Sequence, residues 1–335
     1  MHPIRFEPIF RRYLWGGRRL ASELGKEIGD ETCAESWEVV DRPEANSVVA
    51  CGDLAGQNLQ QLIQQFGPAL LGEEIYQQIN RQELPESLRG RFPLLLKFLD
   101  ANKTLSVQVH PDDAAGLQKQ VPDMGKTEAW YVMGAEKGSE IYGGLKQGVD
   151  RDRLAKAIES KTTNEVLHTF QANAGDCVFV PAGTVHAIGQ GLLIAEIQQC
   201  SDTTYRLFDW NRIDADGNER DLHIQDALAV TDYQRGPVDP QPAIVLDDDR
   251  CSELVKCDKF VIHRWTWQKD RIEIQLDGSF RLLMVTDGEV RVQDDRADAP
   301  LKQGQTMLLP ASMPTAVLEC DPNCEMLEIS VPTSA

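Results

Sequence analysis

The segment running from Gly175 to His186 is the part of this chain that most constrains its fold. Gly175 is expected to open a turn, and the apolar residues Val178–Val180 are expected to form a short strand. Pro181 ends the strand pairing and Gly183 permits a tight turn, so His186 arrives at the start of the next strand. This spacing predicts antiparallel sheet and is typical of a hairpin that carries a metal ligand.

A second segment places further polar side chains inside an apolar strand. Residues 105–110 alternate with period two, which puts Gln108 and His110 on one face together with Ser106. Buried polar groups are costly without partners, and a metal would satisfy them. With Glu128 and His186, these residues would supply two imidazoles and two oxygen ligands, which suits a divalent metal with room for substrate. The plain alternatives are hydrogen-bonding strand histidines and an ordinary charged loop around Glu128.

The C-terminal part of the chain contains a degenerate copy of the first hairpin. The stretch from Gly304 to Pro310 reproduces the spacing from Gly175 to Pro181. In this copy Ser312 stands at the position equivalent to the turn glycine, Gly183, and Thr315 at the position equivalent to His186. Coincidence is the alternative, but strand-length segments recur throughout this region, including a hairpin predicted to turn at Asp287–Gly288. We therefore predict a mainly β fold of two jelly-roll or β-sandwich domains in tandem, with the metal ligand lost from the second.

The predicted domain boundary lies in a proline-rich linker. Residues 237–242 contain three prolines, which separates a metal-binding domain, 1–236, from a C-terminal β domain, 243–335. A small helical insertion is expected at about 53–90 within the first domain, because apolar residues there recur with helical spacing. Helices are predicted at 58–67, 68–80, 151–159 and 224–231.

Composition excludes several classes of partner. The chain has 335 residues and a formal net charge of -19, which argues against binding nucleic acid or an anionic membrane surface. An anionic small substrate would need a local convergence of Lys or Arg. Neither a signal peptide nor a membrane-spanning run is evident, and the eight cysteines contain no C-x-x-C pair, so we expect reduced thiols in the cytoplasm. A disulfide between Cys320 and Cys324 has little support. We expect a monomer or a weak homodimer.

Several blocks of the sequence occur in an order that a known family shares. The blocks are Ser106–Pro111, Gly125–Tyr131, Pro181–Ala187 and Glu196–Arg206, with support from Trp15–Gly17, Glu35–Glu38 and Phe92–Lys97. By these blocks the chain resembles the type I mannose-6-phosphate isomerase family of the cupin superfamily. The resemblance is close up to about residue 230 and looser beyond, and the short helical insertion is similar to the short bacterial form.

This resemblance implies a fold of two cupin-like domains and one zinc ion per chain, Zn2+, with a small-molecule sugar phosphate as substrate. The implied reaction interconverts mannose 6-phosphate and fructose 6-phosphate, an aldose–ketose isomerisation through a cis-enediol intermediate. The implied zinc ligands are Gln108, His110, Glu128 and His186.

The resemblance also implies that Arg206 is the active-site arginine and that Lys126 lines the substrate pocket, both acting in catalysis. Glu196 is a third expected substrate-binding residue. The group that moves the proton stays open among Lys126, Glu196 and a zinc-bound water. Two other interpretations are a different metal-dependent cupin enzyme, such as an iron or manganese dioxygenase or decarboxylase, and a sugar-binding cupin without catalysis.

Overall fold

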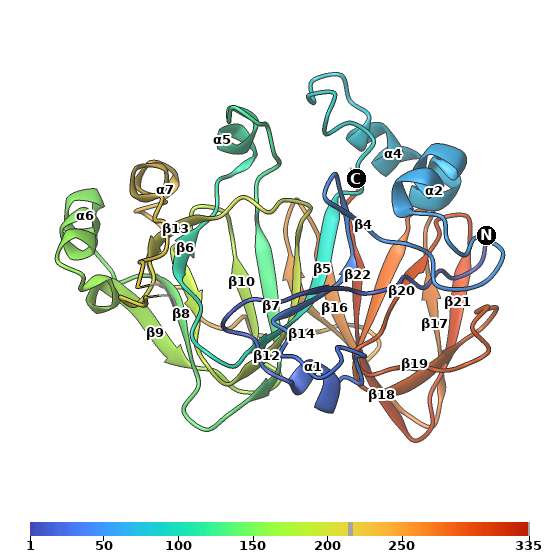
Figure 1. Ribbon diagram of the computed structural model, residues 1–335. Helices are drawn as coiled ribbons and strands as arrows, with labels where there is room; N and C mark the ends of the chain where they lie inside the picture. Colours follow the sequence, from blue (N-terminus) through green and yellow to red (C-terminus); the bar gives the residue numbers. More distant parts are fainter. Residues whose placement is uncertain (214–216, 334–335) are drawn as a thin grey trace. The chain divides into compact units, whose positions relative to one another are not determined.

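The computed structural model describes residues 1–213 and 217–333, and within these residues the protein is mainly β (Figure 1). The expectation of a mainly β fold is therefore confirmed. The chain divides into two compact units: unit 1 comprises 1–11, 18–98 and 242–335, and unit 2 comprises 12–17 and 99–241. The domain boundaries at 236 and 243 stay a prediction.

Unit 2 contains two antiparallel groups of strands. In the first group, β7 lies between β12 and β10. The second is a five-stranded sheet in the order β13-β6-β11-β8-β9. The strands of the first group are β7 (Glu128–Ala135), β10 (Cys177–Val180) and β12 (Leu192–Gln199). Those of the second are β6 (Val107–Val109), β8 (Glu140–Leu145), β9 (Leu167–Gln171), β11 (His186–Ile188) and β13 (Tyr205–Phe208).

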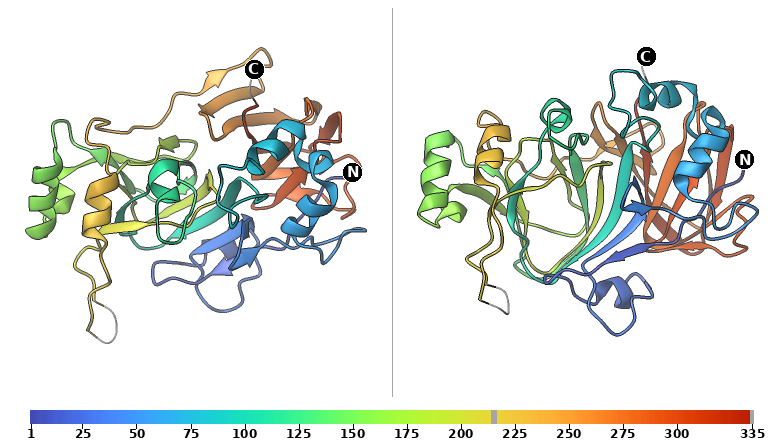
Figure 2. Two further views of the ribbon diagram at one scale, coloured as in Figure 1. Left: turned by 90° about the horizontal axis from the view of Figure 1, so that it is seen from above. Right: turned by 45° about the horizontal axis from the view of Figure 1, so that its top comes forward.

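Two helices cover one face of the five-stranded sheet. Figure 2 shows α6 (Arg151–Glu159) and α7 (Ile224–Val230) side by side along it. Their apolar side chains pack with alternate strand residues, including Val107, Val109 and Ala187, in one buried cluster. Because side chains alternate along a strand, the residues between these point to the opposite face of the sheet, toward the interior of the unit. Both helices match their predicted positions, and shorter elements here are α5 (Asp113–Leu117) and the 3₁₀ helix η1 (Thr163–Val166).

The N-terminal part of unit 1 carries the helical insertion. Its elements are β1 (Ile9–Arg11), α1 (Arg19–Ser22), β2 (Glu35–Val39), β3 (Asp41–Arg42), β4 (Ala45–Asn46), α2 (Leu59–Phe66), α3 (Pro68–Leu71), α4 (Glu73–Ile79) and β5 (Leu94–Ala101), the last continuing into unit 2. Asn58 and Gln61 form a reciprocal capping box that starts α2. The single helix predicted over 68–80 is wrong, because Gly72 adopts a φ of 93° and breaks it into α3 and α4. Gly72 also packs closely on a backbone carbonyl, which leaves no space for a Cβ.

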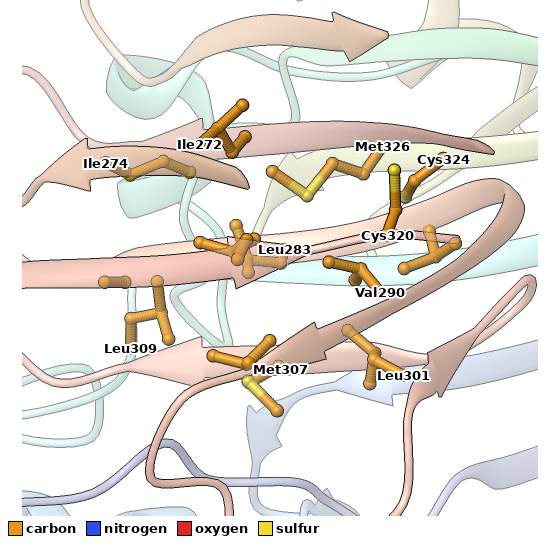
Figure 3. Close-up of a cluster of buried hydrophobic side chains, with 14 of the residues drawn as sticks. Ile272, Ile274, Leu283, Val290, Leu301, Met307, Leu309, Cys320, Cys324 and Met326 are labelled. Carbon is orange, nitrogen blue, oxygen red and sulfur yellow. The ribbon is translucent and has the colours of Figure 1, made fainter. Parts of the chain in front are cut away.

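The C-terminal strands of unit 1 enclose an apolar core. The strands are β14 (Ile244–Val245), β15 (Cys251–Lys256), β16 (Val261–Gln268), β17 (Arg271–Gln275), β18 (Arg281–Val292), β19 (Leu301–Lys302), β20 (Thr306–Leu309), β21 (Thr315–Glu319) and β22 (Asn323–Ser330). Figure 3 shows side chains from these strands, including Leu283, Met307 and Met326, meeting in the core. Cys320 and Cys324 are buried thiols there and form no disulfide.

The hairpin predicted at Asp287–Gly288 is wrong. The strand β18 continues through both residues, with a register shift against β22 between Val285 and Asp287. Before this bulge β18 pairs with β20, and after it β18 pairs with β19 and β21. A bulge bends a strand and increases its twist, so the apparent turn signal is a corner at which one strand passes between two sets of partners.

Candidate metal centre

Three strands of the five-stranded sheet place three polar residues in one row. Gln108 on β6 lies opposite His186 on β11 and opposite Arg206 on β13. All three alternate with residues that pack under α6 and α7, so their side chains point inward. His110 follows the end of β6 and shares the face of Gln108.

The other group of strands supplies the acidic residues. Glu128 begins β7 and lies opposite Val180 on β10 and Gln198 on β12. Two residues further along β7, Trp130 lies opposite Glu196, and its indole Nε1 donates a hydrogen bond of 3.2 Å to the Glu196 carboxylate. Glu128 and Glu196 therefore face the same side of this group.

His110, Glu128 and His186 converge from these elements into one buried cluster, whose candidate ligand atoms all lie within 4.8 Å of one another. Nε2 of His186 lies 3.3 Å from Oε1 of Glu128, and Nε2 of His110 lies 3.6 Å from Oε2. The two imidazole rings are 4.9 Å apart between centroids. Two imidazole nitrogens and a carboxylate are ligands typical of zinc and related divalent ions.

Both histidines are oriented by main-chain carbonyl groups. Nδ1 of His110 donates to the carbonyl of Thr203, and Nδ1 of His186 donates to the carbonyl of Thr184, each at 2.9 Å. A carbonyl oxygen can only accept, so the proton of each neutral ring lies on Nδ1 and Nε2 keeps a lone pair directed into the cluster. Burial also lowers the pKa of His186 to about 4, against an opposing effect of the Thr184 bond, so this ring is neutral near pH 7.

Gln108 completes the group at its less buried edge. Its side-chain Nε2 lies 3.3 Å from Nε2 of His186. Rotating the amide by half a turn would present the carbonyl oxygen at the same place, which is the atom that can ligate a metal. The residue is therefore within reach of the cluster and can serve as a neutral oxygen ligand.

Lys126 is the cation of the site. Its side chain is buried, with Nζ 3.3 Å from Oε2 of Glu128 and 3.3 Å from Nε2 of His110. The ammonium group thus contacts two of the three clustered residues directly. It is placed to donate to an oxygen bound beside them.

Arg206 occupies the more exposed end of the row. Its Nε donates to Ser106 Oγ at 3.2 Å and its Nη1 to the carbonyl of Asp221 at 2.9 Å. Partial burial, with the positive charge of Arg220 nearby, lowers the pKa of Arg206, although a guanidinium stays protonated at neutral pH. The hydrogen bonds of Arg206 are thus to a hydroxyl and a main-chain carbonyl, while the nearby Asp209 pairs with Arg212.

The structure therefore brings together, in unit 2, every residue singled out from the sequence as a site candidate. Sequence reasoning did not find Trp130, Thr184 or Thr203. The tryptophan has a retrospective signal, because it stands two residues after Glu128 on the same strand face. The two threonines act through main-chain carbonyls, which leave no trace in the sequence.

The fold and site define a class of protein: a bicupin-like β protein with one buried histidine–glutamate cluster able to hold a metal. Family models give a finer assignment. The model for the phosphomannose isomerase type I catalytic domain matches residues 4–138, and that for the mannose-6-phosphate isomerase cupin domain matches residues 251–328.

Full-length relatives agree with this assignment. A mannose-6-phosphate isomerase of Streptococcus mutans is 35% identical over 91% of this chain and 92% of its own length. The enzyme ManA of Bacillus subtilis is 34% identical over 96% of this chain and 97% of its own. A crystal structure of the mannose 6-phosphate isomerase from Bacillus subtilis superimposes with a TM-score of 0.84 at 28% identity, covering 98% of this chain and 99% of that one. The chain belongs to the type I mannose-6-phosphate isomerase family, and the predicted enzyme class and two-cupin fold are confirmed.

In the described ranges 1–213 and 217–333, the helices are too short or too polar for any of them to traverse a bilayer.

Proposed function

We propose that this protein interconverts mannose 6-phosphate and fructose 6-phosphate. The observation that carries the proposal is the buried cluster of His110, Glu128 and His186 in a chain of this family. In both histidines Nε2 is unprotonated, so its lone pair is available to a metal. A merely structural trio would not need both rings fixed in the same tautomer and directed at one carboxylate. Lys126 and Arg206 add positive charge beside it, which an anionic sugar phosphate requires on a chain of net charge -19.

The residues present fit a divalent metal, and we propose one zinc ion held by Gln108, His110, Glu128 and His186. Two imidazoles, a carboxylate and an amide oxygen make a set of low charge, so the ion keeps more Lewis acidity than it would with a second carboxylate. When bound, such an ion would stabilise negative charge developing on a substrate oxygen. Elemental analysis of purified protein tests the identity of the ion.

The chemistry requires a proton to move between two neighbouring carbons. In the open-chain aldose, loss of the C2 proton sends the C–H electron pair into a C1–C2 double bond and the carbonyl electron pair onto O1. The resulting cis-enediolate gains a proton on O1 and loses the proton of O2, which gives the enediolate with its charge on O2. The O2 electron pair then forms the C2 carbonyl as the C1–C2 double bond takes a proton at C1, so the two protons lost are balanced by the two gained. Lys126, whose ammonium group already contacts Glu128 and His110, would donate hydrogen bonds to O1 or O2 as charge develops there.

Two further residues would bind the substrate at the edges of the site. Arg206, one strand away from Gln108 and partly exposed, would take the phosphate or another oxygen-rich part of the substrate through its donor fork. Glu196, oriented by Trp130, would accept from a sugar hydroxyl. The choice of proton carrier among Lys126, Glu196 and a zinc-bound water is tested by Lys126→Ala and Glu196→Gln, since loss of the carrier would abolish exchange of the C2 proton with solvent deuterium. Exchange that persists in both variants would favour the water.

The central test is an assay for fructose 6-phosphate formed from mannose 6-phosphate. Product formation is coupled to a nicotinamide-dependent enzyme and followed by the absorbance of the nicotinamide cofactor. We expect turnover by protein as purified, loss of turnover after chelation, and recovery on adding zinc. Absence of turnover with saturating zinc would overturn the proposal. If iron or manganese restored a different reaction, the protein would be another kind of metal-dependent cupin enzyme.

We also propose a cytoplasmic enzyme that acts as a monomer or weak homodimer on a small-molecule substrate. Support for a reducing compartment comes from the eight cysteines, all of which are free thiols in the structure. Cell fractionation and sedimentation at several protein concentrations test the two statements separately.

A further inference from the structure

The two metal-directed histidines are oriented in different ways. His186 donates to the carbonyl of Thr184, which lies two residues earlier in the same tight turn. His110 donates to the carbonyl of Thr203, which lies 93 residues away along the chain. Thr203 belongs to a segment without regular hydrogen-bonded structure, between β12 and β13. A local turn fixes its own carbonyl, whereas a remote irregular segment has to be fixed by other groups.

A buried aspartate fixes that segment. Oδ2 of Asp123 accepts hydrogen bonds from Thr203 Oγ1 at 2.9 Å and from Ser201 Oγ at 3.1 Å. The Ser201 hydroxyl also accepts from the Thr203 main-chain N–H at 3.3 Å, and Lys119 Nζ donates to Thr203 Oγ1 at 2.5 Å. Asp123, Ser201 and Thr203 are all buried, where hydrogen bonds to a carboxylate are strong and costly to lose.

The position of Asp123 is itself determined by a close backbone contact. Its N–H donates to the carbonyl of Gly116 in α5 at 3.1 Å. A Cβ added at Gly116 would lie 2.7 Å from the carbonyl oxygen of Asp123, so this approach requires glycine. The helix, the aspartate and the segment around Thr203 therefore form one connected support.

We propose that Asp123 is a positioning residue for the metal centre: by holding Ser201 and Thr203, it fixes the carbonyl that keeps His110 in its ligating tautomer and orientation. This inference rests on the proposed metal site. It assigns a role to a residue outside the set of proposed ligands. Outer groups that orient a ligating histidine typically change metal affinity by about 10- to 100-fold.

The test measures cobalt binding to metal-free protein, by competition with a chelator and by the visible absorption of bound cobalt, which reports ligand geometry. We expect Asp123→Ala to weaken cobalt binding by about 10- to 100-fold and to alter the absorption bands. Thr203→Val, which keeps the carbonyl and the side-chain shape but removes the hydroxyl, should show the same change to a smaller degree. Thr203→Ser, which restores the hydroxyl, should bind cobalt as the wild type does.

A matched control separates positioning from general loss of stability. Asp41 in unit 1 is also a buried carboxylate with three donors, namely the Phe92 N–H, Arg91 and Asn46. Asp41→Ala should lower the melting temperature without changing cobalt affinity or the absorption bands.

Unchanged cobalt affinity and spectrum in both Asp123→Ala and Thr203→Val would overturn the role of Asp123. Equal weakening by Asp41→Ala and Asp123→Ala would overturn it too, because the effect would then follow stability alone. Wild-type protein that binds no cobalt would instead overturn the metal centre itself.

Discussion

The two β regions of this protein share a strand arrangement but differ at the positions that correspond to His186 and Glu128. In unit 2, β7 pairs with β10 and β12, and β11 pairs with β6. In the C-terminal part of unit 1, β18 pairs with β20 and β22, and β21 pairs with β17. By these registers, Thr315 and its partner Gln275 correspond to His186 and Gln108.

The same comparison identifies the residues of the second region that correspond to Glu128 and Glu196. Val180 lies opposite Glu128 in the first copy, and the equivalent Leu309 lies opposite Arg281 in the second. Glu196 lies opposite Trp130, two residues after Glu128, and Glu328 lies opposite Leu283, two residues after Arg281. Glu328 is therefore the counterpart of Glu196.

Arg281, which is partly buried, and Glu328, which is buried, form an ion pair with Nε 3.1 Å from Oε1. The second copy therefore carries the guanidinium group of Arg281 at the position where the first carries the carboxylate of Glu128. The same arrangement of strands can therefore carry either a histidine–glutamate cluster or a structural ion pair such as Arg281–Glu328.

The largest expected effect is the loss of the metal from the first copy. His186→Ala removes a buried ligand, so we expect loss of bound zinc and a fall in kcat/KM of at least about 10³-fold, because the Lewis acid contributes several kcal/mol. The measurement is metal content together with the coupled assay. Thr315→Ala, at the corresponding position of the second copy, is the control and should retain both properties. Full activity in metal-free His186→Ala would break the comparison.

The next effect concerns stability of the second copy. Arg281→Met leaves Glu328 buried without its guanidinium partner, although Trp265 Nε1 still donates to it at 2.7 Å. We expect the free energy of unfolding to fall by about 3–5 kcal/mol, measured by urea denaturation, with unchanged kcat/KM for the folded fraction. Adding Glu328→Gln should recover most of the loss. A double variant no more stable than Arg281→Met would show that the pair does not account for the effect.

Arg206→Ala probes the first copy without removing a proposed ligand. We expect zinc to be retained and kcat to fall by about 10²- to 10³-fold, as is usual for loss of a charged donor that acts on the transition state. Steady-state kinetics and metal analysis provide the measurement. An increase confined to KM would instead assign Arg206 to ground-state binding of the substrate.

The smallest expected effect is a pH dependence of stability that comes from His186. In metal-free protein the pKa of His186 is lowered to about 4, below the value of 6.5 for an unperturbed histidine, because burial disfavours the charged ring. The unfolded chain then binds a proton that the folded chain does not. This contribution to stability is complete above about pH 6.5 and is lost as the pH falls toward 4, by about 3 kcal/mol in all.

Urea denaturation of metal-free protein between pH 7 and 4 measures this slope, and His186→Gln should reduce it. An equal slope in the variant would assign the acid sensitivity to other groups.

The sequence predicted those parts of the structure that depend on local pattern. The glycine–proline spacing around β10 and the alternation through β6 are enough to place His186, Gln108 and His110, because side-chain direction in a strand follows from position alone. Two local predictions failed where backbone geometry overrode pattern. Gly72 divides a helix because it packs on a distant carbonyl, and Asp287–Gly288 is a bulge within a strand rather than a turn.

Long-range relations were beyond reach for a different reason. Nothing in residues 281 and 328 indicates that they occupy the places of Glu128 and Glu196, because that correspondence comes from register between strands. Likewise, the contribution of Asp123 depends on a loop nearly 80 positions later in the chain.

The use of main-chain carbonyls to orient both histidines has a consequence for how this site tolerates mutation. Thr184 and Thr203 offer oxygens that every amino acid possesses, so no single codon change deletes either acceptor. The tautomer of each ring therefore depends on where the backbone places the carbonyl group that accepts from Nδ1. At Thr184, whose carbonyl is held by its own turn, homologues can therefore exchange the side chain and still keep the same protonation pattern, whereas at Thr203 we expect the hydroxyl that Asp123 holds to be needed as well.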